Sequence, residues 1–299
     1  MNEYLDLLVP QIGRMKTRAE RGEQLKTWGL LPSHPEPGSS LALDDAGFSD
    51  QFSDSYMVSG AAMFPAMTAT DNLVSASVLV KDGSRTRELH APSLINLCRA
   101  AMELSTRAIW VLLDTDREVR RQRALGVLSK ELDEQNTFIS ITENGHEDGA
   151  AKLSDKDHTD FLEHKKLFEE RRNTVRSTPM VKTPAFRFQM NDVAKWLTEN
   201  TPPHDSDELA GRVGFAGKRA YNIGSASVHG YRWMTDYLNG TTNLLGLVAD
   251  AFAGALITTE CAVALIEAQS VIPSNIGSRP ARYPEYLQRT VRAWAPMYQ

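Results

Sequence analysis

Two polar stripes on otherwise apolar stretches hold the residue types that could do chemistry. The first consists of Arg99, Glu103 and Arg107, spaced i, i+4 and i+8. On a helix this spacing places the carboxylate between two guanidinium groups. Such groups can stabilise the negative charge of a reacting phosphate. The other interpretation is a ladder of surface ion pairs, each contributing a few tenths of a kcal/mol.

The second stripe consists of Tyr221, Ser225 and His229, again at i, i+4 and i+8. Imidazole is the side chain best suited to general acid or base catalysis near neutral pH. Gly224 and Gly230 lie beside the stripe and would allow a ligand or another backbone to come close. The other interpretation is a buried polar seam that fixes the register of two helices.

These two stripes resemble a known family. A Y-x-x-x-S-x-x-V-H pattern spans 221–229, with Leu209-Ala210 and Gly214 before it, and an R-x-x-x-E pattern spans 99–103. Both patterns recur in a group of uncharacterised bacterial helical-bundle proteins that is distantly similar to the HEPN superfamily. Many HEPN proteins are ribonucleases of toxin–antitoxin or phage-defence systems, with paired motifs across a dimer interface. The resemblance therefore implies a homodimer and RNA as a partner.

The chain departs from the HEPN nuclease motif at its arginine. That motif has four to six residues between its arginine and its histidine, but positions 222–224 are Asn, Ile and Gly, and Arg219 is too far upstream. If the chemistry is retained, the resemblance assigns the general acid or base to His229 and the phosphorane contact to Arg99 or Arg107. Glu103 would then orient the arginine, while Tyr221 and Ser225 would bind phosphate or position the imidazole. If it is not retained, the chain is a non-catalytic relative.

A third candidate residue is Glu260, within the long apolar stretch 244–266. Asp250 and Glu260 each make a membrane location costly, by about 2.5–3.5 kcal/mol at the bilayer centre. The stretch therefore predicts a buried central helix, on which the Glu260 carboxylate needs a partner. We expect an arginine of the first stripe to be that partner, and a small-molecule site around Glu260 is a further alternative.

Composition indicates an ordinary soluble protein. The chain has 299 residues, a formal net charge of -5, 41% hydrophobic and 24% charged residues. The acidic balance disfavours DNA as a partner. Two cysteines in apolar runs and an acidic N-terminal stretch predict a cytoplasmic protein rather than an exported one. The seven histidines lack paired spacing on a helix, so we expect no metal and no cofactor.

Helical periodicity dominates the chain, so the predicted fold is an all-α multi-helix bundle with a HEPN-like core. An N-terminal helical segment, 1–90, contains a proline-rich linker near 31–40; the bundle core is 91–271, and 272–299 is a C-terminal tail. A short strand is an alternative to helix near residues 74–80, where valines gather. The predicted helices are 3–21, 54–81, 92–113, 116–140, 154–176, 190–199, 205–229 and 241–271, with 142–152 and 177–188 as loops.

Two functions from different classes fit these patterns. The first is a non-catalytic helical binding or scaffold module that keeps its polar seams for structural reasons. The second is a metal-independent ribonuclease of the HEPN type. The distances of the charged residues from His229 separate the two, because a nuclease needs a guanidinium near the imidazole.

Overall fold

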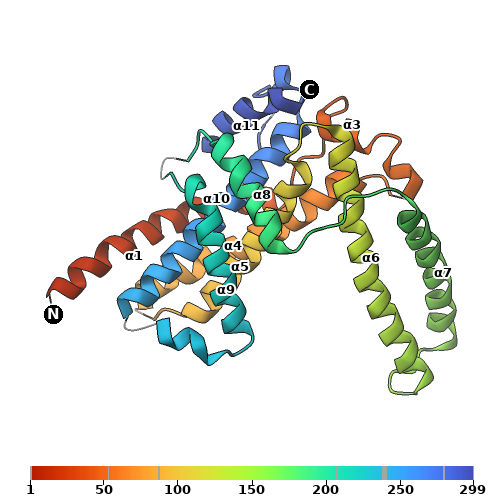
Figure 1. Cartoon of the computed structure of the whole chain (residues 1–299), viewed down its shortest axis with the longest axis horizontal. Helices are drawn as coiled ribbons and strands as arrows, with labels where there is room; N and C mark the ends of the chain where they lie inside the picture. Colours follow the sequence, from red (N-terminus) through yellow and green to blue (C-terminus); the bar gives the residue numbers. More distant parts are fainter. Residues whose placement is uncertain are drawn as a thin grey trace.

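The fold is all-α, as predicted (Figure 1). The computed structural model describes residues 2–52, 54–86, 88–205, 208–237, 241–278 and 280–298, without the side chains of 2–9, 234 and 241–243, and none of these residues is in a strand. The α-helices are α1 (Asn2–Glu23), α2 (Lys26–Leu30), α3 (Ser40–Asp45), α4 (Met57–Thr86), α5 (Ala91–Leu112), α6 (Arg117–Glu147), α7 (Asp155–Ser177), α8 (Phe186–Glu199), α9 (Val213–Val228), α10 (Thr241–Ser270) and α11 (Gln288–Trp294).

The central helix is α10, which packs against α1, α4, α5, α9 and α11. Every residue from 251 to 271 is buried. The segment Leu244–Ser270 is long and apolar enough to cross a membrane, yet 94% of its most apolar window is buried inside the protein. A helix that is apolar on all sides is expected in the core of a large bundle. The predicted buried central helix is therefore confirmed.

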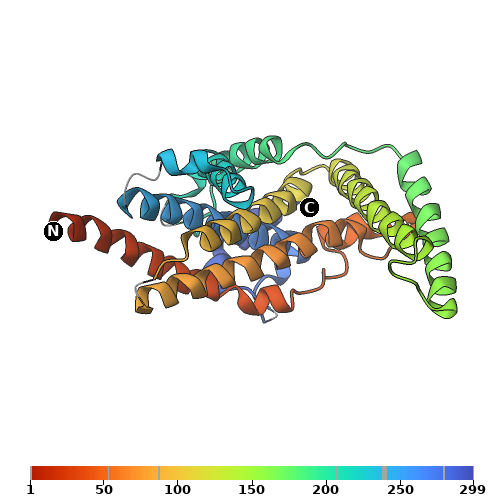
Figure 2. The same cartoon turned by 90° about the horizontal axis from the view of Figure 1, so that it is seen from below.

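Helices α4 and α5 lie side by side along the length of the bundle (Figure 2). Leu73, Ala76 and Val80 of α4 are buried at helical spacing, so the alternative of a strand at 74–80 is wrong. The reason is packing: Val80 faces the core, whereas Val78 is 52% exposed, so the two valines lie on different sides of a helix. In α5, Pro92 occupies the first turn, where its missing N–H costs nothing.

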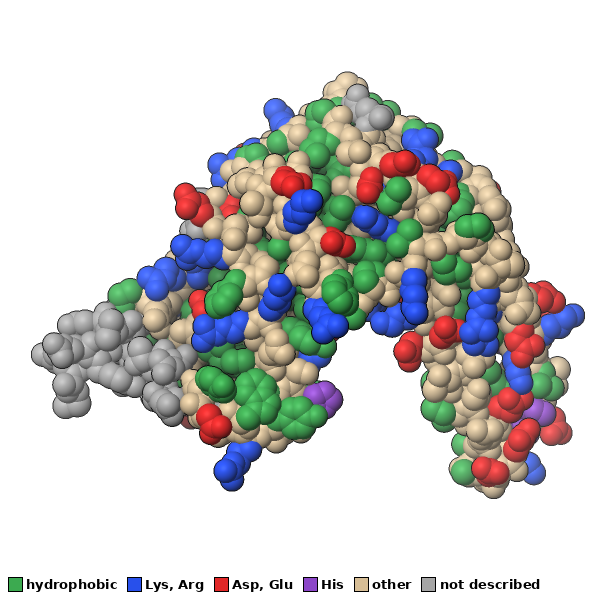
Figure 3. Space-filling model, viewed as in Figure 1, with side chains coloured by type: hydrophobic (Ala, Val, Ile, Leu, Met, Phe, Trp, Pro, Cys, Tyr) green, Lys and Arg blue, Asp and Glu red, His purple; other side chains and the backbone are tan. Residues whose placement is uncertain are grey.

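Helices α6 and α7 form a hairpin that projects away from the bundle (Figure 1). A broad hollow separates this hairpin from the bundle (Figure 3). The sparse apolar residues of 154–176 predicted such a projecting helix. The predicted loop at 142–152 is too long, because α6 continues to Glu147. The extra turns are held by contacts with α7, including the Lys165 Nζ to Glu143 Oε1 ion pair at 2.6 Å.

Polar pairs alternate with apolar residues where α6 faces α7. Ile139 and Phe168 are buried in this seam. The polar pairs are Asn136 with Arg172, 2.9 Å between Oδ1 and Nη1; Glu143 with Lys165; and the stacked rings of His146 and His158, 4.1 Å between centroids. Polar seam positions fix the register of a helical pair at a cost in stability. These polar pairs thus specify the register of the hairpin.

The C-terminal segment is part of the core rather than the tail that we predicted. Leu287, Val291 and Trp294 are buried, and the Trp294 ring meets Trp196 of α8 edge to face with 4.9 Å between centroids. Their i, i+4, i+7 spacing is a helical face that the neighbouring prolines obscured. Elsewhere, α8 begins earlier than predicted. The predicted helix 205–229 is shorter, because α9 begins only at Val213; positions 206 and 207 lie outside the described residues.

Candidate functional site

Helices α5 and α9 bring part of the two predicted stripes together. Arg99 Nε donates to Glu103 Oε1 at 2.8 Å, one turn along α5. The guanidinium carbon of Arg99 lies 4.8 Å from the centre of the Tyr221 ring on α9, a cation–π contact. Gly224 makes this approach feasible, since a Cβ there would lie 2.7 Å from Arg99 Cδ. The ring of Phe186 covers Tyr221, with 4.9 Å between centroids.

His229 lies apart from this group. Arg99 places its Cβ, Cγ and Cδ against Gly224 and its guanidinium over Tyr221, so the charged end points toward the start of α9. His229 follows the last residue of α9, at the opposite end of that helix, and is exposed. Its ring stacks on Tyr231, with 5.4 Å between centroids. The arrangement therefore directs the Arg99 guanidinium away from the imidazole.

The remaining members of the stripes serve other contacts. Arg107 faces α6, where its charge and that of Arg171 partly offset the desolvation that raises the pKa of Glu131. Ser225 is half-buried, and its carbonyl oxygen accepts the N–H of His229 at the end of α9. Neither residue extends the Arg99 cluster toward His229.

Glu260 has a partner, but not the one we expected. Both oxygens of its carboxylate accept from Arg21 of α1, at 2.6 Å from Nε and 2.7 Å from Nη2. Tyr286 Oη also donates to Glu260 Oε1 at 2.6 Å. The expectation of Arg99 or Arg107 is wrong because Arg99 lies against α9 and Arg107 faces α6, whereas Glu260 faces α1.

The charge of Glu260 is stabilised despite complete burial. Desolvation is the largest influence and raises the pKa of this carboxyl, but His204 and Arg21 together outweigh it, so the net shift is downward. A buried carboxylate with a bidentate arginine partner stays ionised and structural. Glu260 is therefore not paired with an arginine of the first stripe. The alternative of a small-molecule site around Glu260 has no support.

The Glu260 network continues inward through a histidine. His204 Nε2 lies 3.4 Å from Glu260 Oε2, and His204 Nδ1 lies 2.8 Å from Thr290 Oγ1. A hydroxyl, an imidazole and a carboxylate in sequence have the connectivity of an activated nucleophile. However, Glu260, His204 and Thr290 are all at most 1% exposed, so no substrate can reach the hydroxyl. The network holds α1, α10 and the C-terminal segment together.

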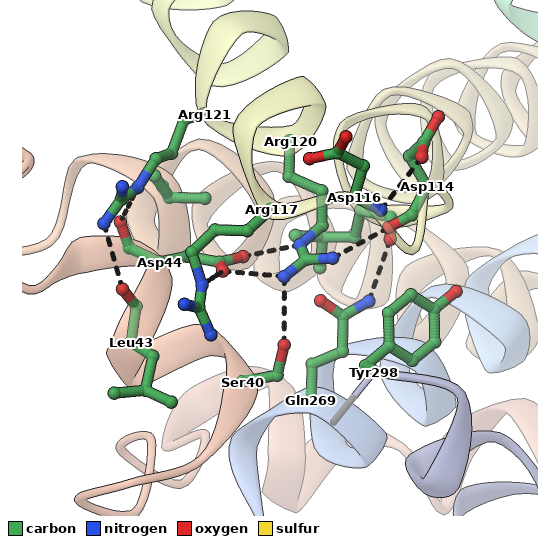
Figure 4. Close-up of polar contacts among 12 residues, drawn as sticks. Ser40, Leu43, Asp44, Asp114, Asp116, Arg117, Arg120, Arg121, Gln269 and Tyr298 are labelled. Atoms are coloured by element: carbon green, nitrogen blue, oxygen red, sulfur yellow. Dashed lines mark hydrogen bonds and ion pairs between the residues drawn. The ribbon is translucent and has the colours of Figure 1, made fainter.

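A second buried ion pair was not foreseen from the sequence (Figure 4). Arg120 of α6 and Asp44 of α3 are both at most 1% exposed. Arg120 Nε and Nη2 donate to the two oxygens of Asp44 at 2.6 and 2.7 Å. Its remaining N–H groups reach Ser40 Oγ and the carbonyl oxygens of Asp114 and Thr115. All five guanidinium donors are engaged, so none is left for a ligand.

A cavity lined by arginines was not foreseen either. It lies between α1, the start of α9 and α10, encloses about 330 Å³, and is lined by Arg14, Arg18, Arg212 and Asp250 among others. The signal was present on α1: Arg14, Arg18 and Arg21 are spaced i, i+4 and i+7, one helical face. The exposed Arg212 joins them only through the fold.

Comparisons with protein-family models, with curated proteins and with solved structures gave no match to this chain. Over the residues that the structure describes, no group of three or more His, Cys, Asp or Glu side chains has the arrangement of a metal site. Function must therefore be inferred from the chain's own geometry.

Proposed function

We propose that this chain is a non-catalytic helical binding module. One observation carries the proposal: Arg99, which contacts α9, is paired with Glu103 and covers Tyr221, with its charge directed away from His229. A nuclease of the expected type needs arginine and imidazole around one phosphate. The paired stripe instead serves the packing of α5 against α9.

The α6–α7 hairpin is the element that we assign to partner binding. Four large apolar side chains on it are strongly exposed: Phe138 (69%), Ile141 (64%), Leu162 (47%) and Leu167 (60%). Exposed apolar side chains that gather on one element mark protein contacts. A two-helix hairpin cannot cover such residues alone, but two hairpins can pack as a four-helix bundle.

A second copy of the chain is the partner that the hairpin fits. A two-fold interface presents the same surface twice, so it must be self-complementary. The hairpin carries both signs of charge next to its exposed apolar residues: the exposed Glu163 follows Leu162, and the exposed Lys166 precedes Leu167. Opposite charges on one surface can pair across a two-fold axis. The proposed assembly is a homodimer.

Light scattering on the purified protein tests this function. We expect a dimer for the wild type and a monomer for the double variant Phe138→Glu with Ile141→Glu, because two charges would be buried in the interface. The matched control is Phe215→Glu, a 72% exposed aromatic residue on α9, outside the hairpin, which should remain dimeric. A wild-type protein that stays monomeric up to its solubility limit would contradict the assignment of the hairpin.

The ribonuclease remains a second proposal, supported by one observation. His229 is exposed at the end of the helix whose Tyr221 lies under Arg99, so an RNA could reach it. RNA cleavage in EDTA by the wild type and by His229→Ala, paired with growth on induced expression, decides between the two. The binding module predicts no cleavage and no toxicity in either protein. Cleavage or toxicity that disappears in His229→Ala would overturn the assignment as a non-catalytic binding module.

A further inference from the structure

The cavity between α1, the start of α9 and α10 has the features of an anion-binding site. Its wall includes Gln11, Arg14 and Arg18 from α1, Arg212 before α9, and Asp250 from α10. The lining also includes small residues, among them Gly246, Ala249 and Gly254. Small side chains leave the space open, and long basic side chains surround it. This is a concave site with a few convergent polar groups.

Two of the arginines are available to a ligand. Arg14 and Arg212 are exposed and form no hydrogen bond or ion pair with any residue in the described parts of the chain. Arg21, on the same face of α1, makes a useful contrast, since Glu260 takes two of its donors. No acid in the described parts of the chain pairs with Arg14 or Arg212 in this way. Asp250 lines the same cavity but lies beyond ion-pair distance of both arginines.

The charge of the lining favours a dianion. Arg14 and Arg212 supply two positive charges that no acid in the described parts of the chain pairs. A phosphomonoester near neutral pH carries close to two negative charges, whereas a carboxylate carries one. The planar guanidinium fork also matches phosphate oxygens in a bidentate geometry. The forks of Arg14 and Arg212 come from two separate elements, α1 and the residues before α9, and so can approach one phosphate from different sides.

The same cavity offers acceptors for a second part of the ligand. Asp250 is exposed and presents carboxylate oxygens, which accept but cannot donate. Gln11 Oε1 is buried at the wall without a hydrogen-bond partner among the described residues. Hydroxyl groups would satisfy both acceptors. The volume of about 330 Å³ lies at the lower end of the range for small-molecule pockets.

We propose that this cavity binds a phosphorylated small molecule, with its phosphomonoester held by Arg14 and Arg212 and a hydroxyl group hydrogen-bonded to Asp250. The ligand would bridge α1, α9 and α10. This site is independent of the hairpin dimer, because none of its lining residues belongs to α6 or α7.

Isothermal titration calorimetry in phosphate-free buffer tests the proposal, with inorganic phosphate, ribose 5-phosphate, adenosine 5′-monophosphate and citrate as probes. We expect both phosphate esters to bind more tightly than inorganic phosphate, and citrate to bind more weakly than either ester. Affinity should fall as salt rises, because the contact is largely electrostatic.

Single variants then assign the binding to the cavity. Arg14→Gln and Arg212→Gln should each weaken ester binding by about tenfold or more, since each removes charge-assisted hydrogen bonds. Both residues are exposed, so the thermal midpoints should stay at the wild-type value. The matched control is Arg187→Gln, an exposed arginine on α8 outside the cavity, which should bind as the wild type does.

A variant of Asp250 should change the affinity for phosphate in the opposite direction. Asp250→Ala removes a like charge, so inorganic phosphate should bind several-fold more tightly, while the advantage of the hydroxyl-bearing esters should shrink. Three results would overturn the proposal: no binding of either ester to the wild type, unchanged binding in both arginine variants, or citrate binding as tightly as the esters. Binding of a 5′-phosphorylated RNA but of neither ester would also reject a small molecule as the ligand.

Discussion

Two arginine clusters in this protein differ in what surrounds their guanidinium groups. At the junction of α3 and α6, Arg120 is buried and all five of its N–H groups meet acceptors (Figure 4). In the cavity beside α1, Arg14 and Arg212 are exposed and no described residue accepts from them. The first cluster is complete without a ligand, and the second is not. Counting the acceptors around a cation therefore distinguishes a structural role from a binding role better than charge does.

The Arg21–Glu260 pair is intermediate between these two clusters. Its carboxylate is fully buried, while the Arg21 side chain is 17% exposed. Arg14 lies two turns before Arg21 on the face of α1 that lines the cavity, so one helix supplies both a structural and an available cation. The acids of α10 determine the difference: Glu260 is within reach and Asp250 is not.

The largest expected effect is at the closed cluster. Arg120→Met leaves the Asp44 carboxylate buried without its main partner and should lower the free energy of unfolding by about 3–5 kcal/mol. Arg212→Met, in the open cavity, should change it by less than about 0.5 kcal/mol. Urea unfolding followed by circular dichroism measures both. Equal losses in the two variants would show that the distinction between the clusters is false.

The intermediate pair should respond to pH. Glu260→Gln should cost about 2–4 kcal/mol at neutral pH, since Arg21 loses its buried counter-charge. The folded-state pKa of Glu260 is lowered, so its stabilising contribution is complete above the unfolded pKa and is lost as pH falls through the folded one.

Urea midpoints across a pH series measure this effect. The difference between wild type and Glu260→Gln should be constant from about pH 7 to 5 and shrink below about pH 4.5. Asp45 contributes with the opposite sign, because desolvation raises its pKa despite hydrogen bonds from Ser59 and Val58. That contribution is common to both proteins and cancels. A difference that grows on acidification would reject the sign of the Glu260 shift.

Two glycines also differ in the space that surrounds them. A Cβ on Gly126 of α6 would lie 1.9 Å from the carbonyl oxygen of Val181, in the segment that joins α7 to α8. Gly126→Ala should therefore cost about 1–3 kcal/mol. Gly246→Ala, at the cavity, meets nothing within 4 Å and should stabilise by about 0.4–1 kcal/mol. Thermal midpoints that shift in the same direction would contradict this pair of predictions.

The smallest effect is expected in the hairpin, at the Glu143–Lys165 ion pair. The variants are Glu143→Leu alone, Lys165→Leu alone and the two changes together. The two side chains are 31% and 28% exposed, so water screens the pair and each single change should alter the protection of the hairpin amides only a few-fold. The double change should be neutral or protective, because it leaves no charge without its partner. Hydrogen exchange measures this locally, and a double variant less protected than either single variant would refute it.

Helical spacing within one element was predictable from the sequence. The i, i+4 pair Arg99–Glu103 and the buried α10 both follow from periodicity, and both are found. The partner of Glu260 could not be predicted, because Arg21 lies 239 residues away and any of several arginines was compatible with the pattern. The cavity could not be predicted for the same reason, because Arg212 comes close to α1 only after α9 and α10 have packed. Periodicity reports which face is buried, but not which distant helix covers it.

The distance in sequence between the N-terminal segment and α10 also has a consequence for how the chain folds. The Arg21–Glu260 and Trp28–Glu267 hydrogen bonds each join residues 239 positions apart, so the chain from 21 to 28 runs parallel to α10 at a constant offset. Contacts of such long range form slowly, because a very large loop must close first. During synthesis the first helix leaves the ribosome long before its acidic partners exist. Until they meet, the two carboxylates make burial of α10 costly, so we expect docking of the N-terminal segment to be a late step in folding.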